Sequence, residues 1–373
     1  LSSAASDVYK RQITPMVQSK GINFNGQNIY IGIDVHLKSW SVTIITESGY
    51  KRTHSQKPSA KELFEHLKKH YPNGKYQAVY ESGFSGYSTY YALKEYGIKC
   101  MIIHAADVPT SQYENVMKTD AIDSEKLAKS LKGGLLRGIY VRDKEELDDR
   151  SLIRLPKTLQ KQLGGYKSRV KHLLYNNGIS YPDCFENSRS HWSNRFIYWL
   201  ENEVRLLSST RLSLDLLIDQ VKLFRKNLLK ATRMVRDLSK KPQYSRQYEN
   251  LISIPGIGLV TAMCLLTEIG DVSRFHNQRE FASFLGLIPS CHSSGENIYN
   301  MEKTFRGNKH LGPLVIESAW VSIRHDRAMS MAYGAYCKRM KGQEAIIRIA
   351  RKMSNRILSV LKSGKKYQYD KVR

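Results

Sequence analysis

The sequence predicts an α/β domain in the first part of the chain and helices in the rest. Up to about residue 143, short apolar runs rich in β-branched residues alternate with segments of helical spacing, which is typical of an α/β domain. From residue 144 those runs disappear, and apolar residues recur every three or four positions between Arg and Lys, as in long helices. The length of 373 residues allows two or three domains, each able to bury a core.

The elements of the α/β domain follow from the pattern between residues 28 and 131. Two β-branched runs within residues 28–46 flank the polar segment HLKS, so we expect two antiparallel strands joined by a tight turn. Another turn follows at 47–49. This alternation of strands and helices predicts a mixed sheet. The later elements are expected in the order helix 60–70, strand 76–80, helix 87–96, strand 99–104 and helix 118–131, the last with Thr119 as its N-cap.

Helices dominate the remainder of the chain. Residues 144–240 are predicted to form long coiled-coil helices with a turn at 181–183, and residues 151–240 hold 17 basic and 7 acidic residues. This positive face fits either a nucleic-acid track or an ordinary solvated coiled-coil surface. A helical domain is expected at 248–332, and a basic amphipathic tail with 12 basic and 2 acidic residues follows at 333–373.

The charge of the chain points to a polyanionic partner. There are 59 Lys and Arg against 34 Asp and Glu, a net charge of +25, and clustered basic residues gain affinity for phosphates by releasing counterions. The five cysteines form no CxxC pair, which argues against a disulfide framework or a zinc site. No apolar run is long enough for a membrane helix and no signal-peptide pattern is seen, so we expect a cytoplasmic, nucleoid-associated protein.

Residues 1–27 are treated as a tail outside the fold. Residues 1–12 lack an initiator Met, and their last part, DVYKRQ, resembles the translation of a sequencing-library adapter. The alternative is a genuine flexible tail, and in both cases we expect the segment to lie outside the fold.

Four acidic residues form the candidate catalytic site. Asp34 lies at the end of the first predicted strand and Glu81 directly follows the strand YQAVY. Asp120 and Asp123 are three residues apart, which places both carboxylates on one helix face. Carboxylates gathered in this way suit Mg²⁺, which prefers oxygen ligands. As an alternative, Asp120 and Asp123 are N-terminal helix acids favoured by the helix dipole.

The order of these four acids resembles the DEDD arrangement of RNase H-like Holliday-junction resolvases. The resemblance implies an RNase H-like catalytic domain at residues 28–143, in which Mg²⁺ ions polarise the scissile phosphate and stabilise the departing oxygen. No role is assigned to His36, because a single histidine beside a motif is more often a hydrogen-bonded bystander.

The run LISIPGIGLVTAMCLL at residues 251–266 has the pattern of a helix-hairpin-helix. Gly256 and Gly258 allow a tight turn that offers backbone N–H groups at a helix N-terminus to a DNA phosphate. Such a contact would position DNA without reading its sequence. A plain connection between two helices of a core is the alternative.

A longer pattern in the second half carries a family resemblance. The IPGIG segment, the RF…FASFLGLIP helix, the SSGE turn and the K…RGN…L segment occur in this order between residues 254 and 311. They resemble the second domain of the bridge-RNA-guided transposases of the insertion-sequence family numbered one hundred and ten, and the acids of the first domain fit the same family. The resemblance covers nearly all of residues 29–360. It implies a recombinase that acts on target and donor DNA, is guided by a structured RNA and forms a homodimer or higher oligomer.

The resemblance also implies the nucleophile. The family carries a serine directly before a glycine in the turn after the GLxP motif, and the matching residue here is Ser294. Its hydroxyl would attack a DNA phosphate to give a covalent phosphoserine, while Mg²⁺ on the four carboxylates stabilises the released 3′ oxygen. Since Ser294 lies far along the chain from Asp34, this implies a composite site assembled by dimerisation through the helical middle. The neighbouring Ser293 leaves the assignment open by one residue.

One departure from the family pattern is Gly312, which stands where the family usually has Arg. Arg306 and Lys309 nearby could supply the missing positive charge to a phosphate, or could be surface charge only. Two other functions stay open at this stage. One is a metal-dependent junction resolvase or nuclease that uses water as the nucleophile, and the other is a non-catalytic nucleic-acid-binding protein.

Overall fold

The computed structural model describes residues 23–110, 119–294, 297–303 and 307–368, and for the strands within 289–303 it describes the backbone only. The chain divides into two compact units, Leu1–Val141 and Arg142–Arg373. The division falls close to residue 143, where the sequence pattern changes. Among the helices of the described residues, none has the length and apolar character that crossing a membrane requires.

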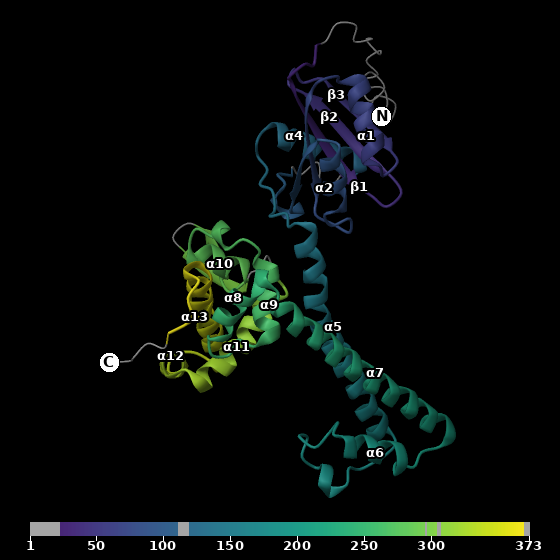
Figure 1. The fold of residues 1–373 in the computed structure, drawn as a ribbon, viewed down its shortest axis with the longest axis vertical. Coiled ribbons are helices and arrows are strands. Elements are labelled where there is room, and N and C mark those ends of the chain that lie inside the picture. Colours follow the sequence, from purple (N-terminus) through teal and green to yellow (C-terminus); the bar gives the residue numbers. More distant parts are fainter. Residues whose placement is uncertain (1–22, 111–118, 295–296, 304–306, 369–373) are drawn as a thin grey trace, which may run out of the picture. The chain divides into compact units, whose positions relative to one another are not determined.

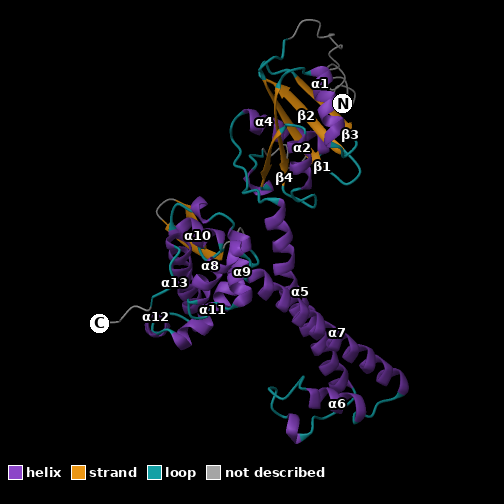
Figure 2. Cartoon of the chain, in the orientation of Figure 1, coloured by secondary structure: helices purple, strands orange, loops and turns teal. Residues whose placement is uncertain are grey.

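The first unit is built on a five-stranded mixed sheet (Figure 1 and Figure 2). The strands lie in the order β3-β2-β1-β4-β5. Neighbours among β1, β2 and β3 are antiparallel, whereas β4 and β5 run parallel to β1. The predicted mixed sheet is confirmed, and the arrangement is consistent with an RNase H-like domain. The strand bounds are β1 Asn28–Val35, β2 Trp40–Thr46, β3 Lys51–Gln56, β4 Lys75–Glu81 and β5 Lys99–Ile103.

Helices cover both faces of this sheet. On one face, leucines of α1 and α2 join a core formed with the isoleucines of β1. On the other face, Leu127 of α4 packs with Val79 of β4. All three helices were predicted from the sequence, with the N-cap of α4 at Thr119. Their bounds are α1 Ala60–His70, α2 Ser88–Glu95 and α4 Asp120–Lys132, and a short 3₁₀ turn, η1, spans Ala105–Asp107.

Helix α4 approaches strand β1 closely because residue 32 is glycine. A Cβ added to Gly32 would lie 2.1 Å from the backbone oxygen of Ser124 and 2.5 Å from the backbone nitrogen of Ala128. Alternate residues of a strand point to the same face, so Asp34, two residues after Gly32, also lies on the α4 face. The glycine thereby brings the first turns of α4 toward the end of β1.

The first unit differs from the sequence prediction at two places. Strand β3 was not predicted, because the polar edge strand KRTHSQ lacks the alternating apolar pattern that marks a half-buried strand. Phe24 is 5% exposed and packs against Tyr71 with ring centroids 5.1 Å apart. The fold therefore takes in Phe24, which belongs to the segment treated as a tail.

A long pair of helices begins the second unit. Helices α5 and α7 pack against one another, with α6 at the tip of the pair (Figure 1). The three helices share an apolar core that includes Val170, Phe196 and Ile218. The long helices predicted for residues 144–240 are therefore present. Their bounds are α5 Lys144–Asn176, α6 Asn194–Asn202 and α7 Ser208–Ser239, with the 3₁₀ turn η2 at Asp183–Phe185.

The rest of the second unit packs around another core. Helix α13 buries Ile349, Met353 and Ile357 in it, so the basic helix near the end of the chain is also a packing helix. A two-stranded antiparallel hairpin, β6–β7, was not predicted. The bounds are α8 Pro242–Ile252, α9 Leu259–Ile269, η3 Val272–Arg274, α10 Gln278–Phe284, β6 Pro289–Ser294, β7 Asn297–Lys303, α11 Leu311–His325, α12 Arg327–Cys337 and α13 Gly342–Ser363.

Candidate functional site

Two of the predicted acids lie at the same edge of the sheet. In the parallel pair β1–β4, Ile33 is the register partner of Tyr80, and Asp34 and Glu81 are the next residues along their strands. Asp34 is the penultimate residue of β1, and Glu81 is the last residue of β4. Ligand sites of α/β sheets form at the carboxyl ends of the strands, and this is the edge at which Asp34 and Glu81 lie.

The other two predicted acids lie in the first turn of α4. Asp120 is the first residue of this helix, and Thr119 caps it by accepting a hydrogen bond from a backbone N–H at 3.3 Å. Asp123 follows in the same turn. The Ser124 hydroxyl lies 2.9 Å from the hydroxyl of Thr43 in β2, and both side chains are buried. This buried hydrogen bond fixes the beginning of α4 on the sheet.

Asp34 and Asp120 meet at a histidine. Nε2 of His36 lies 3.1 Å from Oδ2 of Asp34 and 3.5 Å from Oδ1 of Asp120. One ligand atom from each of the three residues lies within 4.8 Å of the other two. Among the described residues, no other group of three or more His, Cys, Asp or Glu side chains meets this distance. The side chains are 24% exposed for Asp34, 49% for His36 and 63% for Asp120, so the cluster is open to a ligand.

Asp123 and Glu81 are not members of this cluster. The Asp123 side chain is 18% exposed, and its carboxylate pairs with Lys126 at 3.1 Å. Glu81 ends β4 at the neighbouring position, but its carboxylate does not meet the 4.8 Å distance. The structure therefore brings together two of the four predicted acids and adds a histidine to which sequence reasoning gave no role.

The electrostatics of the cluster favour a bound cation. Burial raises the pKa of the Asp34 carboxyl above its ordinary value, His36 acts against this rise, and the negative charges of Asp120 and Asp123 add to it. A divalent cation would remove the repulsion among these carboxylates, and Mg²⁺ takes oxygen ligands of this kind. Asp34 and Asp120 thus fit a divalent metal ion, with the His36 imidazole beside them.

The predicted nucleophile lies at the end of a strand. Ser294 is the last residue of β6 and pairs with Asn297 of β7, and Ser293 pairs with Ile298. Residues 295 and 296, which follow Ser294, and the predicted phosphate contact Arg306 lie outside the described residues. The backbone therefore places both candidate serines at the last two paired positions of β6.

Two glycines close the base of this hairpin. A Cβ added to Gly307 would lie 2.2 Å from the Cα of Gly286, so the two ends of the hairpin segment touch backbone to backbone. The backbone N–H of Asn308 donates to the carbonyl of Phe284 at 2.7 Å. The Asn308 side chain accepts two backbone N–H groups at the start of α11, at 2.9 and 3.0 Å. Gly307 and Asn308 therefore anchor the hairpin, and the exposed Lys309 follows them.

A buried carboxylate holds Asn308 in place. Glu268, near the end of α9, is 1% exposed and accepts a hydrogen bond from Asn308 Nδ2 at 3.0 Å. The same carboxylate lies 2.6 Å from Nε of Arg154 and 3.1 Å from Nη2 of Arg150, both in α5. Burial acts to raise the pKa of Glu268, but the arginine hydrogen bonds outweigh it and lower the pKa to about 2. Glu268 is thus a fixed negative charge that joins α5, α9 and the base of the hairpin.

The two glycines of the predicted helix-hairpin-helix lie between α8 and α9. Gly256 has a φ of +93°, and a Cβ added to it would lie 2.2 Å from the backbone oxygen of Ser318 in α11. Close packing therefore accounts for Gly256. Gly258 is exposed and directly precedes α9. The helix, turn and helix are present, and a phosphate contact there stays a prediction.

Two family models match the chain. A model described as a transposase, of the DEDD type of IS110, matches residues 31–176, and one described as the transposase IS116/IS110/IS902 family matches residues 248–334. The first match takes in the Asp34–His36–Asp120 cluster, and the second takes in the β6–β7 hairpin, in which Ser294 is the last residue of β6. The chain belongs to the IS110 family of transposases.

Relatives of this IS110-family chain are known in several bacteria. The y4qE protein of Sinorhizobium fredii, named as a transposase, is 24% identical over 289 residues, which are 78% of this chain and 66% of that protein, just under two thirds of its length. The y4rJ protein of the same species, also named as a transposase, is 26% identical over 363 residues, 87% of this chain and 89% of that protein. The pilin gene-inverting protein of Moraxella bovis is 33% identical over 132 residues, 34% of this chain and 40% of that protein.

Three residues of this IS110-family protein were missed by sequence reasoning. Gly32 interrupts a strand of isoleucines, and a glycine inside a strand is a signal of close backbone approach. Glu268 is an acid at the end of the apolar run LVTAMCLLTEI, and a buried acid requires partners. No local sequence pattern marks His36 as a member of the site, because its contact with Asp120 depends on where α4 lies.

Proposed function

We propose that this protein cuts and rejoins DNA strands, with the Asp34–His36–Asp120 cluster as its metal centre and Ser294 as its nucleophile. The observation that carries the proposal is the convergence of Asp34 from β1 and Asp120 from α4 in a region that matches a DEDD transposase model. The name of the Moraxella relative, a gene-inverting protein, adds support for recombination.

The proposed chemistry is a phosphoryl transfer. Mg²⁺ held by Asp34 and Asp120, with Glu81 and Asp123 as further carboxylates, would stabilise negative charge on the scissile phosphate and on the departing oxygen. The Ser294 hydroxyl passes its proton to water as its oxygen bonds to phosphorus. The bond from phosphorus to the 3′ oxygen breaks, and the departing 3′ oxygen takes up a proton from water to become a hydroxyl. Because the covalent phosphoserine replaces one phosphate ester by another, rejoining to a new strand needs no ATP.

We propose target DNA, donor DNA and a structured guide RNA as partners of this protein in the cytoplasm. The net charge of +25 supports polyanionic partners. Gly258, Arg306 and Lys309 are the proposed phosphate contacts. We also propose a homodimer or higher oligomer that forms through a coiled coil of α5 and α7, and exposed leucines on α7 support it. They are Leu212, Leu216 and Leu223, which are 61%, 59% and 48% exposed.

The metal centre is tested with Asp34→Asn and Asp120→Asn. Mn²⁺, a paramagnetic substitute for Mg²⁺, reports metal binding by electron paramagnetic resonance, and strand exchange is measured in parallel. Each variant should lose metal binding and strand exchange while nucleic-acid binding remains. Glu65→Gln, which changes an exposed acid of α1, is the matched control and should behave as wild type. Strand exchange at the wild-type rate in EDTA would refute a metal-dependent mechanism.

The nucleophile is tested by trapping the covalent intermediate. The wild type should form a protein–DNA adduct that survives denaturation, whereas Ser294→Ala should form none. Ser293→Ala is the matched control, and loss of the adduct in this variant alone would move the nucleophile by one residue. Free DNA ends without any adduct would instead indicate a nuclease that uses water. Absence of any metal-dependent cleavage would leave a nucleic-acid-binding protein.

A further inference from the structure

The segment between α5 and α6 holds a tryptophan in a backbone conformation that large side chains rarely adopt. Trp192 has a φ of +69°, and Asn73 is the other non-glycine residue with a positive φ in the described part of the chain. Asparagine tolerates this conformation, but a bulky residue is an outlier in it. Strain of this kind persists where surrounding groups enforce it, and it is concentrated at ligand-binding and switch sites.

Contacts from α6 and α7 enforce the conformation of Trp192. Nη1 of Arg225 donates to the carbonyl oxygen of Trp192 at 2.8 Å. The indole packs edge-on against Phe196, with ring centroids 5.4 Å apart. Ser193 caps α6 by accepting the backbone N–H of Phe196 at 3.2 Å. Together these contacts hold the half-buried indole in the wall of a cleft between α5 and α7.

This Trp192 cleft combines an aromatic ring with apolar and cationic side chains. Its volume is about 520 Å³, which is in the range of small-molecule sites. Leu163 and Leu228 contribute apolar surface. The cations in its wall are Lys167, Arg225 and Lys226.

Among the described residues, the cations of the Trp192 cleft have no acidic partner. Nζ of Lys167 lies 5.4 Å from the centroid of the Trp192 ring. Burial and the positive charges of Arg225 and Lys171 lower the pKa of Lys167. Within the residues that the structure describes, no ion pair involves Lys167, Arg225 or Lys226, although Lys222 on the same helix pairs with an acid. An anionic ligand would relieve the repulsion among these cations.

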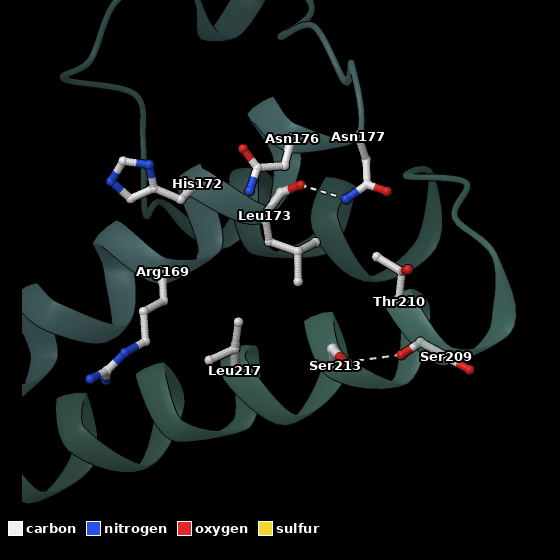
Figure 3. Close-up of a pocket in the computed structure, with 9 residues that line it drawn as sticks. All are labelled: Arg169, His172, Leu173, Asn176, Asn177, Ser209, Thr210, Ser213 and Leu217. Carbon is white, nitrogen blue, oxygen red and sulfur yellow. Dashed lines mark hydrogen bonds between the residues drawn. The ribbon is translucent and has the colours of Figure 1, made fainter.

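A second cleft between the same two helices lacks this combination. It lies between the last turns of α5 and the first turns of α7 (Figure 3). Its volume is about 460 Å³. Its Asn177 and Ser213 side chains donate to backbone carbonyls at 2.8 and 3.0 Å. Its Arg169 lies over the ring of Tyr166, and no Trp, Tyr or Phe is among the residues that line it. The Trp192 cleft is therefore the better candidate for a ligand with both a flat ring and a negative charge.

We propose that the Trp192 cleft binds one unpaired nucleotide of a nucleic-acid strand. The indole stacks on the base, while Lys167 and Lys226 contact the adjacent phosphates and Arg225 holds the Trp192 backbone. Stacking of this kind tolerates any base, because every base has a π face. A base within a duplex is already stacked, so the site selects single-stranded segments. The inference rests on the proposed function in that it requires a chain that acts on nucleic acid.

The test compares binding of labelled single-stranded RNA, single-stranded DNA of the same sequence and the corresponding duplex. Trp192→Ala should weaken single-strand binding by roughly 5- to 150-fold, the usual range for loss of one stacked base. Trp192→Phe should retain most of the affinity, and duplex binding should change little. Tyr198→Ala, which removes a 60% exposed aromatic of α6 outside the cleft, is the matched control and should bind as wild type.

Two further measurements separate a binding role from a structural one. Thermal unfolding of each variant checks the fold, and ultraviolet crosslinking should attach the base to the peptide that holds Trp192. Lys226→Gln should weaken single-strand binding more than Lys230→Gln does, because Lys226 lines the cleft and Lys230, one turn farther along α7, does not. Both substitutions leave the aromatic core unchanged.

The outcomes distinguish this inference from the proposed function. Tighter binding of RNA assigns the nucleotide to a guide RNA, tighter binding of DNA assigns it to a DNA strand, and both support the site. If Trp192→Ala bound single strands as well as Tyr198→Ala did, the inference would fall and the proposed function would stand. A protein that binds no nucleic acid would overturn both.

Discussion

Replacing Glu268 by Gln should destabilise the second unit without changing a proposed catalytic residue. In the folded protein, hydrogen bonds from Arg154 and Arg150 outweigh burial and lower the carboxyl pKa from 4.5 to about 2. Since one pKa unit corresponds to about 1.4 kcal/mol, the ionised side chain contributes about 3 kcal/mol to the free energy of unfolding at neutral pH. Because the folded pKa is the lower one, this contribution is complete above pH 4.5 and is lost as the pH falls through about 2.

The assay is urea unfolding of the full chain, followed by hydrogen exchange of peptides from α9 and α11. These peptides report the second unit alone, which matters because a chain with two compact units need not unfold in one step. Glu344→Gln, at an exposed acid of α13, is the control and should change stability by less than about 0.5 kcal/mol. If Glu268→Gln unfolded like Glu344→Gln, or if the difference persisted unchanged in acid, Glu268 would not be an ionised anchor.

Other predictions concern the packing of α4, a histidine stack and the basic face of α13. Gly32→Ala should destabilise the first unit by about 3 kcal/mol or more, since the new Cβ would meet the α4 backbone at 2.1 Å. A variant that unfolds at the same temperature as the wild type and binds Mn²⁺ equally well would contradict this. His66, whose ring lies 4.3 and 4.5 Å from two neighbouring histidine rings, has its pKa lowered to about 4 by burial and their charges. As the pH falls, the His66 imidazole therefore takes up a proton in the unfolded chain before it does so in the folded protein. The free energy of unfolding should fall from pH 6.5 towards 4, as measured by urea unfolding. His66→Gln should flatten this part of the dependence of stability on pH. Deletion of α13 would open the core, so the double variant Arg351→Gln with Lys352→Gln is the better test of its charge. For nucleic-acid binding, this variant should lower the slope of the logarithm of the binding constant against the logarithm of the salt concentration by about two. An unchanged slope would mean that α13 has a packing role alone.

Local signals were sufficient for most elements of the first unit. The helix at residues 60–70, the strand predicted at 76–80 and the Thr119 cap each depend on residues a few positions apart. The structure confirms them, with the strand extended by one residue at each end. The convergence of Asp34 with Asp120 was expected because the four acids follow the order of the DEDD arrangement and gathered carboxylates suit Mg²⁺. Its physical cause, the close approach at Gly32, becomes visible only when α4 is known to cover that face.

Features that escaped prediction depend on residues far apart in the chain. Glu268 bonds to Arg154, 114 positions away, and no sequence period marks such a pair. The role of His36 depends on α4, a helix that begins more than eighty residues later. The β6–β7 hairpin is held by the crossing of Gly286 and Gly307, which local propensity does not reveal. The nucleophile assignment came from family resemblance alone, because a serine before a glycine is common in loops.

The glycine crossing below the β6–β7 hairpin makes the segment between Gly286 and Gly307 an interchangeable module. Its two ends already touch, so we expect residues added or removed between them to leave α10 and α11 in place. Doubling the length of a closed loop costs only about 0.6 kcal/mol in closure entropy. During evolution, insertions in this segment can therefore alter the reach of the hairpin while the helical scaffold stays unchanged. Protein engineers can use the same crossing as a graft point for hairpins from other IS110-family transposases.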